Sequence, residues 1–204
     1  MMCSPIPRPS YEGREPPRRR HRLGDVDLSR NRPGGPYDHL PEVGTFTLSS
    51  EDIADGEVLP MTHVHGSAGG EDLSPQLSWS GFPAETRSFA ITCFDPDAPT
   101  HSGWWHWAVV NIPVSVTSLP RGAGAPDGSG MPPGAVQFRT DYGTAGYGGA
   151  APPPGDHDHR YFFAVHALDV DHLDLSPDTP VAIVGFNLTA HTLARGVLVA
   201  TFAH

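Results

Sequence analysis

Short apolar runs alternate with stretches rich in Gly and Pro along most of the chain. The runs cover residues 45–48, 77–82, 88–94, 104–112, 135–140 and 160–170. Short runs bounded by turn residues are typical of strands, and several in succession indicate an all-β sandwich. Two intervening loops, residues 113–134 and 141–158, are long and rich in Gly and Pro. We therefore predict a mainly β, antiparallel sandwich, whose long loops are of the kind that is often functional or mobile.

One helix is predicted near the end of the chain, in "SPDTPVAIVGFNLTAHTLARG". Asp178 or Thr179 can cap its N-terminus, Pro180 fits its first turn, and Gly196 can end it. The residues at helical spacing are Val184, Leu188, His191 and Arg195. A last strand, "VLVATF", then follows the C-terminal helix.

The first 43 residues differ in composition from the rest. They are rich in Pro, Arg and Gly and contain too few apolar residues to offset the entropy of ordering them. We predict a flexible tail over residues 1–43 and one domain over residues 44–204. The tail carries eight of the 13 basic residues and six of the 23 acidic ones, so the domain is acidic. A net charge of −10 argues against nucleic-acid binding.

The cysteines and the N-terminal sequence bear on the cellular compartment in which the protein is expected. Cys3 falls in the predicted tail and Cys93 in a predicted strand, which is a poor basis for a disulfide and favours a reducing environment. The N-terminal "MMCSPIPRPSYEGREPPRRRHR" lacks an apolar core, and no stretch approaches the ~20 apolar residues of a membrane span. We expect a soluble, cytoplasmic protein without stable membrane insertion.

Two predicted strands carry polar rings in apolar rows. Strict alternation in "WWHWAVVNI" places His106 on the same face as Ala108 and Val110. In "HRYFFAVHALD" His159 and Tyr161 share a face. Burying an unpaired polar group costs about 1 to 3 kcal/mol, so each ring needs a partner or a ligand.

Four motifs in order carry a resemblance to a known family: "DPDAP", "WWHWAVVN", "GYGGAAPPPG" and "HRYFFAVHALD". Over about residues 44–204 the chain resembles the phosphatidylethanolamine-binding proteins, also called Raf kinase inhibitor-like proteins, and in particular their bacterial branch. The resemblance implies a large antiparallel sheet, a smaller sheet, few helices and a small pocket for phosphate and similar anions. It implies no accepted catalytic reaction and no cofactor.

The family's pocket residues map onto this chain by their motifs. The resemblance implies that Asp95, His106, His159 and Tyr161 bind the ligand. The matched rim residues are Gly148, Gly149, Pro152 and Pro153. Trp105 stands where animal members commonly have a second histidine, so the entrance differs in polarity. The resemblance, together with the sharp reversal that "DPDAP" needs, also predicts a cis peptide at Ala98–Pro99.

Imidazole and phenol groups suit an anion site because they donate hydrogen bonds, and a nearby carboxylate raises an imidazole pKa and fixes its tautomer. The expected ligand is phosphate or a phosphorylated small molecule. The family includes inhibitors of kinases and proteases, so a protein partner of that kind stays open, as does a homodimer.

Two other interpretations use the same residues. In the first, the two histidines pair with Asp95 and Tyr161 only to satisfy one another in the core. In the second, "HVH" at 63–65 and "DHDH" at 156–159 supply ligands for a metal-dependent enzyme, with Asp95 and His106 completing the set. In the anion-pocket interpretation, which we prefer, His63 lies at the surface.

Overall fold

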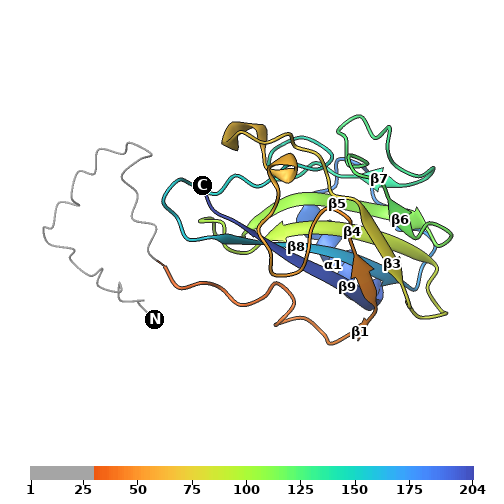
Figure 1. Cartoon of the computed structure of the whole chain (residues 1–204). Helices are drawn as coiled ribbons and strands as arrows, with labels where there is room; N and C mark the ends of the chain where they lie inside the picture. Colours follow the sequence, from red (N-terminus) through yellow and green to blue (C-terminus); the bar gives the residue numbers. More distant parts are fainter. Residues whose placement is uncertain (1–29) are drawn as a thin grey trace, which may run out of the picture.

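The computed structural model describes residues 30–204, which fold into two β-sheets and one α-helix (Figure 1). The larger sheet has the strand order β1-β9-β8-β4-β5-β7, and the smaller has the order β2-β3-β6. The larger sheet contains β1 (Gly44–Thr45), β4 (Ser88–Asp95), β5 (Trp104–Pro113), β7 (Val136–Gln137), β8 (His159–Leu168) and β9 (Thr192–Phe202). The smaller sheet contains β2 (Thr47–Ser49), β3 (Leu77–Ser80) and β6 (Ser118–Leu119). Neighbouring strands in these sheets are antiparallel except β1 and β9. The predicted antiparallel sandwich is confirmed.

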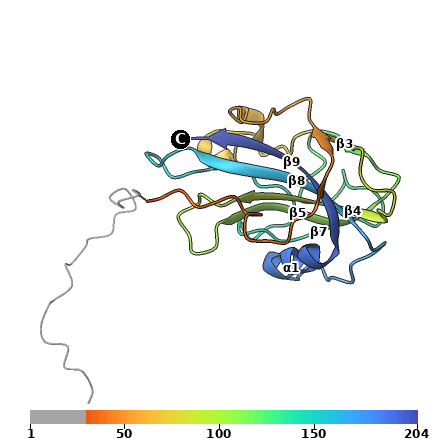
Figure 2. The ribbon, with the colours of Figure 1, turned by 90° about the horizontal axis from the view of Figure 1, so that it is seen from below.

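Each face of the larger sheet packs against its own apolar cluster. Phe89 and Ile91 of β4 join Trp79 of the smaller sheet in one cluster. Ala90, between them in sequence, joins Val184 of α1 (Val181–His191) in the other. Successive strand residues point to opposite faces, so β4, buried over residues 88–93, contributes to both clusters. Figure 2 shows α1 and β3 on opposite sides of the larger sheet.

The helix begins at Val181 with Pro180 as its N-cap, so the predicted capping by Asp178 or Thr179 is wrong, and it ends earlier than predicted. Its last residue is His191. Arg195 and Gly196 lie inside β9 instead, so the predicted stop at Gly196 is wrong. The reason is tertiary: β8 offers hydrogen-bonding partners along the whole of β9, and a Cβ at Gly196 would lie 2.9 Å from the Cβ of Leu48. Among residues 30–204, no helix has the length and apolar character to cross a membrane.

Residues 30–43 contact the domain, although the sequence assigned them to the flexible tail. Arg30 forms an ion pair with Asp156 at 2.8 Å. The guanidinium of Arg195 stacks 3.9 Å from the centroid of the Tyr37 ring, which also meets Phe162 edge-on at 6.4 Å. The predicted tail is therefore corrected for residues 30–43. For residues 1–29, which lie outside the described part of the chain, it stays a prediction.

These contacts predict different effects for two truncations. Deleting residues 1–43 should lower Tm by about 4 to 8 °C relative to deleting residues 1–29. The cation–π and ring contacts of Tyr37 and the ion pair of Arg30 together contribute roughly 2 kcal/mol. Calorimetry of both truncated proteins measures the difference. Equal Tm values would show that the contacts of residues 30–43 contribute nothing to stability.

Candidate functional site

A cavity of about 350 Å³ lies where β4 ends and β5 and β8 begin. Its lining includes Asp95, Trp104, His106, Tyr142, Pro152, Pro153, His159 and Tyr161. Six of the eight predicted site residues, Pro153 included, therefore meet here although they come from three strands and a loop. Gly148 and Gly149, the other two, do not line the cavity.

A β-bulge turns His106 toward this cavity. In the pairing of β4 with β5, Cys93 lies opposite Trp107 and Phe94 opposite Trp105, so His106 is the extra residue. A bulge of this kind reverses the alternation of faces. His106 consequently lies on the cavity side, with its ring 5.0 Å from that of Tyr161, while Ala108 packs in the cluster on the helix side. The predicted shared face of His106 and Ala108 is wrong for this reason.

His159 is held between two carboxylates. Its Nδ1 lies 2.7 Å from Oδ2 of Asp95, and its Nε2 lies 2.9 Å from Oδ2 of Asp156. An ionised carboxylate only accepts hydrogen bonds, so both ring nitrogens donate and the ring is an imidazolium. Burial opposes this charge, but the bonds to Asp95 and Asp156 outweigh burial and raise the pKa of His159 above its ordinary value.

Asp156 is the centre of this charged cluster. Arg30 donates to it from both ends of its guanidinium, at 3.0 and 2.8 Å, and His157 Nδ1 lies 2.8 Å away. Burial alone would raise the pKa of Asp156, but these hydrogen bonds and that of His159 hold it far below its usual range. The sequence marked Asp156 only as a candidate metal ligand. It gave no signal for Arg30, which lies 126 residues away in the chain.

The other oxygen of Asp95 shapes the loop after β4. Oδ1 accepts the backbone N–H groups of Asp97 and Ala98, at 2.7 and 3.1 Å. A further backbone hydrogen bond joins Thr100 N to Ala98 O at 2.7 Å. These hydrogen bonds accompany the reversal of the chain after β4. The Ala98–Pro99 peptide bond is trans, as are all peptide bonds of residues 30–204. The predicted cis bond is wrong.

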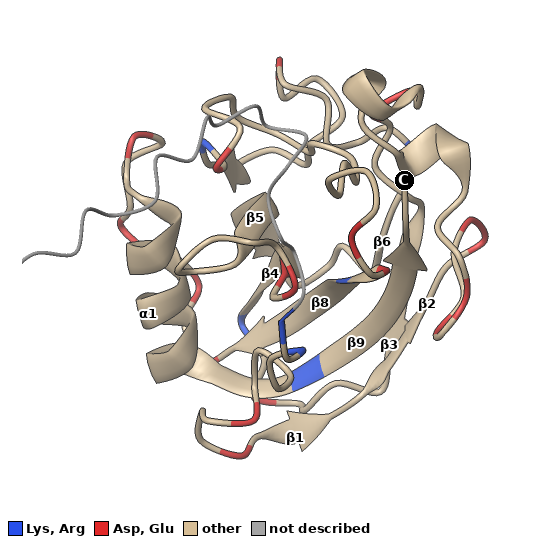
Figure 3. Ribbon diagram, turned by 90° about the vertical axis from the view of Figure 1, so that its left-hand side faces the viewer, with Lys and Arg blue, Asp and Glu red and all other residues tan. Residues whose placement is uncertain are grey.

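The second aspartate of the motif ties this loop to β8. Asp97 is fully buried, and its carboxylate accepts from Nε of Arg160 at 2.7 Å and from the backbone N–H of Arg160 at 2.9 Å. Asp95 and Asp97 therefore both bind the first residues of β8, Asp95 through His159 and Asp97 through Arg160. Figure 3 looks at this end of the molecule, where acidic and basic segments lie close together.

Three buried polar atoms of the cavity lining have no hydrogen-bond partner among the described residues. They are Nε2 of His106, the hydroxyl of Tyr161 and Nε1 of Trp104. Nδ1 of His106 donates to the carbonyl of Gly148 at 2.8 Å. Burial lowers the pKa of His106, so its ring is neutral and Nε2 presents a lone pair. Burying such groups unpaired is costly, which indicates a polar ligand.

The two rim glycines lie behind the cavity wall. Gly148 supplies the carbonyl that fixes the tautomer of His106. Gly149 donates its N–H to Asp72 Oδ1 at 2.8 Å and accepts from the hydroxyl of Tyr142 at 2.9 Å. A Cβ at Gly149 would lie 2.4 Å from the backbone of Val64. Close packing of backbone against backbone, and not contact with a ligand, explains why this position is glycine.

The histidines of "HVH" take structural roles. His63 is buried, with Nδ1 2.6 Å from the carbonyl of Leu73, so the prediction that it lies at the surface is wrong. His65 stacks on Tyr142 with ring centroids 4.6 Å apart. In the part of the chain that the structure describes, no group of three His, Cys, Asp or Glu side chains is arranged to hold a metal ion. Nothing in this geometry favours the metal-dependent enzyme.

Comparison with known proteins identifies the family. A family model described as phosphatidylethanolamine-binding protein matches residues 49–203. The chain belongs to the phosphatidylethanolamine-binding protein family. Two Escherichia coli relatives are UPF0098 protein YbhB, 50% identical over 161 residues, and UPF0098 protein YbcL, 49% identical over 155. The alignments cover 76% of this chain and 99% of YbhB, and 75% of this chain and 85% of YbcL.

A solved structure supports the same assignment. The crystal structure of E. coli YbcL, described as a new member of the mammalian PEBP family, matches with a TM-score of 0.77 and 47% sequence identity. The match covers 79% of this chain and 99% of that one. Asp95, His106, Asp156 and His159 all lie inside the region of this chain that the family model matches, whereas Arg30 precedes it.

The packing of Gly149 predicts a large effect of a small substitution. Gly149→Ala should destabilise the protein by about 3 kcal/mol or more, because backbone atoms on both sides would have to shift. Gly66→Ala is the matched control, since the nearest atom to a Cβ there is a side-chain oxygen of Asp72 at 3.4 Å. Urea denaturation compares the two variants. Equal stabilities would refute the close-packing explanation.

Proposed function

We propose that this protein binds phosphate or a phosphorylated small molecule in the 350 Å³ cavity, and that it binds this ligand without transforming it. The observation that carries the proposal is the set of three unpartnered polar atoms on His106, Tyr161 and Trp104. A phosphate oxygen can accept from the hydroxyl and from the indole N–H. The cavity is near the lower end of the size range of small-molecule sites and suits a headgroup-sized ligand.

The protonation states of the site favour a partly protonated ligand. Neutral His106 presents Nε2 as an acceptor, so a fully ionised phosphate would meet a lone pair there. A phosphate that keeps one proton can donate it to Nε2. Alternatively, the ring takes up a proton when the anion binds and then forms a charge-assisted hydrogen bond. In both cases one additional proton lies between His106 Nε2 and the phosphate in the bound state. Binding is therefore linked to the uptake of a proton.

The carboxylates near the cavity do not exclude an anion. The charge of Asp95 is balanced by the imidazolium of His159, and that of Asp156 by Arg30. In the sequence-based prediction His159 donates directly to the ligand. The contacts support a different role: both its nitrogens are engaged, so it supplies positive charge and holds Asp95 in place.

The family supports this class of ligand, since phosphatidylethanolamine carries a phosphate in its headgroup. A kinase or protease partner and a homodimer stay predictions, as does the cytoplasm as the compartment.

Phosphate binding should strengthen as pH falls from about 8 to about 6. As the pH falls over that range, a larger fraction of the phosphate carries a second proton, and protonation of His106 in the complex costs less free energy. Both effects favour the bound state. Calorimetric titration of inorganic phosphate measures this directly. His106→Gln should reduce the pH dependence to the part that comes from protonation of the phosphate itself, and His159→Ala should remove most of the binding because two carboxylates would then face the anion. Tighter binding at higher pH would contradict the proposal.

Tyr161→Phe separates binding from folding in the same titration. It should weaken phosphate binding roughly tenfold while leaving Tm unchanged or higher, because the hydroxyl has no partner to lose within the described residues. His172→Gln, at an exposed position, should change neither quantity. Unchanged phosphate affinity in Tyr161→Phe would show that the cavity is not the binding site.

A further inference from the structure

A second cavity, of about 590 Å³, lies on the opposite face of the larger sheet. It is bounded by α1, by the larger sheet and by residues 30–43, which we call the N-terminal segment. Its lining includes Tyr37, Leu40, Thr92, Phe94, Trp105, His166, Phe186, Leu188 and Arg195. No residue lines both this cavity and the phosphate site described above. Its volume lies within the usual range of sites for small organic ligands.

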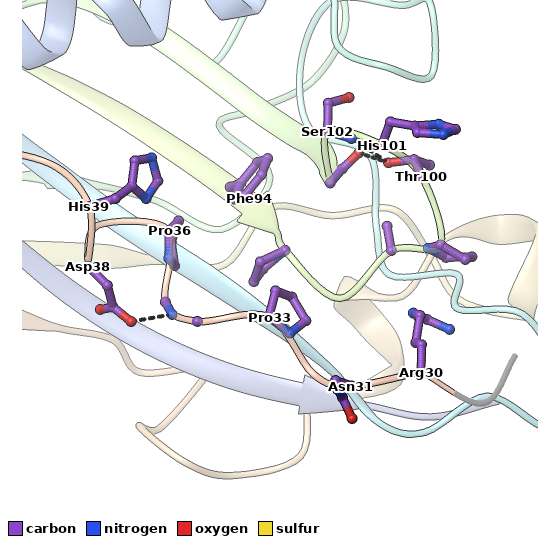
Figure 4. A pocket seen from close by; sticks show the side chains of 16 residues that line it. Arg30, Asn31, Pro33, Pro36, Asp38, His39, Phe94, Thr100, His101 and Ser102 are labelled. Atoms are coloured by element: carbon purple, nitrogen blue, oxygen red, sulfur yellow. Dashed lines mark hydrogen bonds between the residues drawn. The ribbon is translucent and has the colours of Figure 1, made fainter.

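An adjoining pocket opens this cavity toward the loop after β4 (Figure 4). Figure 4 labels five side chains that line both spaces: Pro36, His39, Phe94, His101 and Ser102. They come from residues 30–43, from the end of β4 and from the last residues of the β4–β5 connection. A ligand can therefore enter between the N-terminal segment and the β4–β5 connection.

Arg195 is the only arginine among the described residues that line this cavity, and none of those lining residues is a lysine or a carboxylate. The other six described arginines each form an ion pair with an aspartate. Arg195 forms none with a carboxylate of residues 30–204. Its guanidinium stacks on the Tyr37 ring, and its Nε donates to Nδ1 of His166 at 3.4 Å. Burial lowers the pKa of His166 to about 3, so that ring is neutral and supplies no counter-charge.

The geometry of Arg195 suits a carboxylate. Stacking on Tyr37 uses the face of the guanidinium, and the bond to His166 uses Nε. The two terminal nitrogens remain for an anion, and an arginine fork matches two oxygens of one planar acid group. A doubly charged phosphate would find no second arginine or lysine among the described lining residues.

Much of the remaining wall is apolar. Leu40, Phe94, Trp105 and Leu188 surround the space, and Phe186 stands at its rim with 76% of its surface exposed. An exposed phenylalanine beside an apolar cavity is a place where a ligand would bury further apolar surface.

From the cavity, its apolar walls and the unpaired Arg195, we propose that this face binds a small amphiphilic anion. The ligand class is a monocarboxylate with an aromatic or aliphatic body, its acid group on Arg195 and its body between α1 and the N-terminal segment. This site is independent of the phosphate site.

The test uses two probes of nearly equal shape, naphthalene-2-carboxylate and naphthalene-2-carboxamide, titrated into the full chain at about pH 8, above the ordinary pKa of an imidazole. The carboxylate should bind roughly tenfold more tightly than the carboxamide. Arg195→Gln should remove that difference, Arg195→Lys should restore part of it, and Arg139→Gln, an exposed control, should leave it unchanged. Saturating inorganic phosphate should not compete.

Phe186→Ala tests the apolar part of the proposed site and can be measured even if Arg195→Gln does not fold. It should weaken both probes several-fold without changing Tm, because the side chain is exposed. Equal affinity of the wild-type protein for the two probes would overturn the proposal. So would unchanged carboxylate binding in folded Arg195→Gln, or competition by phosphate.

Discussion

The hydrogen bonds between Asp95, His159 and Asp156 hold together the end of this protein that carries the candidate site. His159 has both ring nitrogens on carboxylates, at 2.7 and 2.9 Å, and all three side chains are almost completely buried. Removing one partner from such a buried charged set commonly costs about 3 to 5 kcal/mol. Through these bonds the end of β4, the start of β8 and the loop before β8 are fixed in one arrangement. Arg30 extends the same set to the N-terminal segment.

The cavity beside these three side chains is polar without being strongly charged, because each carboxylate near it has a cation of its own. The bulge in β5 completes it by turning His106 toward Tyr161. Gly148 then fixes His106 in the tautomer that leaves Nε2 unpaired among the described residues. Unpaired polar atoms beside this set of charge-balanced carboxylates favour the binding of a small polar ligand.

The periodicity of the sequence was sufficient to predict most strands, and the family resemblance implied Asp95, His106, His159 and Tyr161, all of which line the cavity. Periodicity alone had mixed success with the faces of these strands. It predicted the shared face of His159 and Tyr161 correctly because β8 is regular. It failed at His106, since one extra residue in β5 reverses the face and leaves no mark in the hydrophobic pattern. It also failed at Arg195, where helical spacing continues into a segment that β8 holds as a strand. Arg30 was beyond sequence reasoning because its partner is distant in the chain.

The protonation of two histidines tests the central claim most directly. Nitrogen-15 NMR of the imidazole rings at about pH 7 distinguishes an imidazolium from either neutral tautomer. The account predicts that His159 is protonated on both nitrogens and that His106 carries a proton on Nδ1 alone. A neutral His159 at that pH would contradict it, because one carboxylate would then lack its donor and the charge balance of the cavity would be lost.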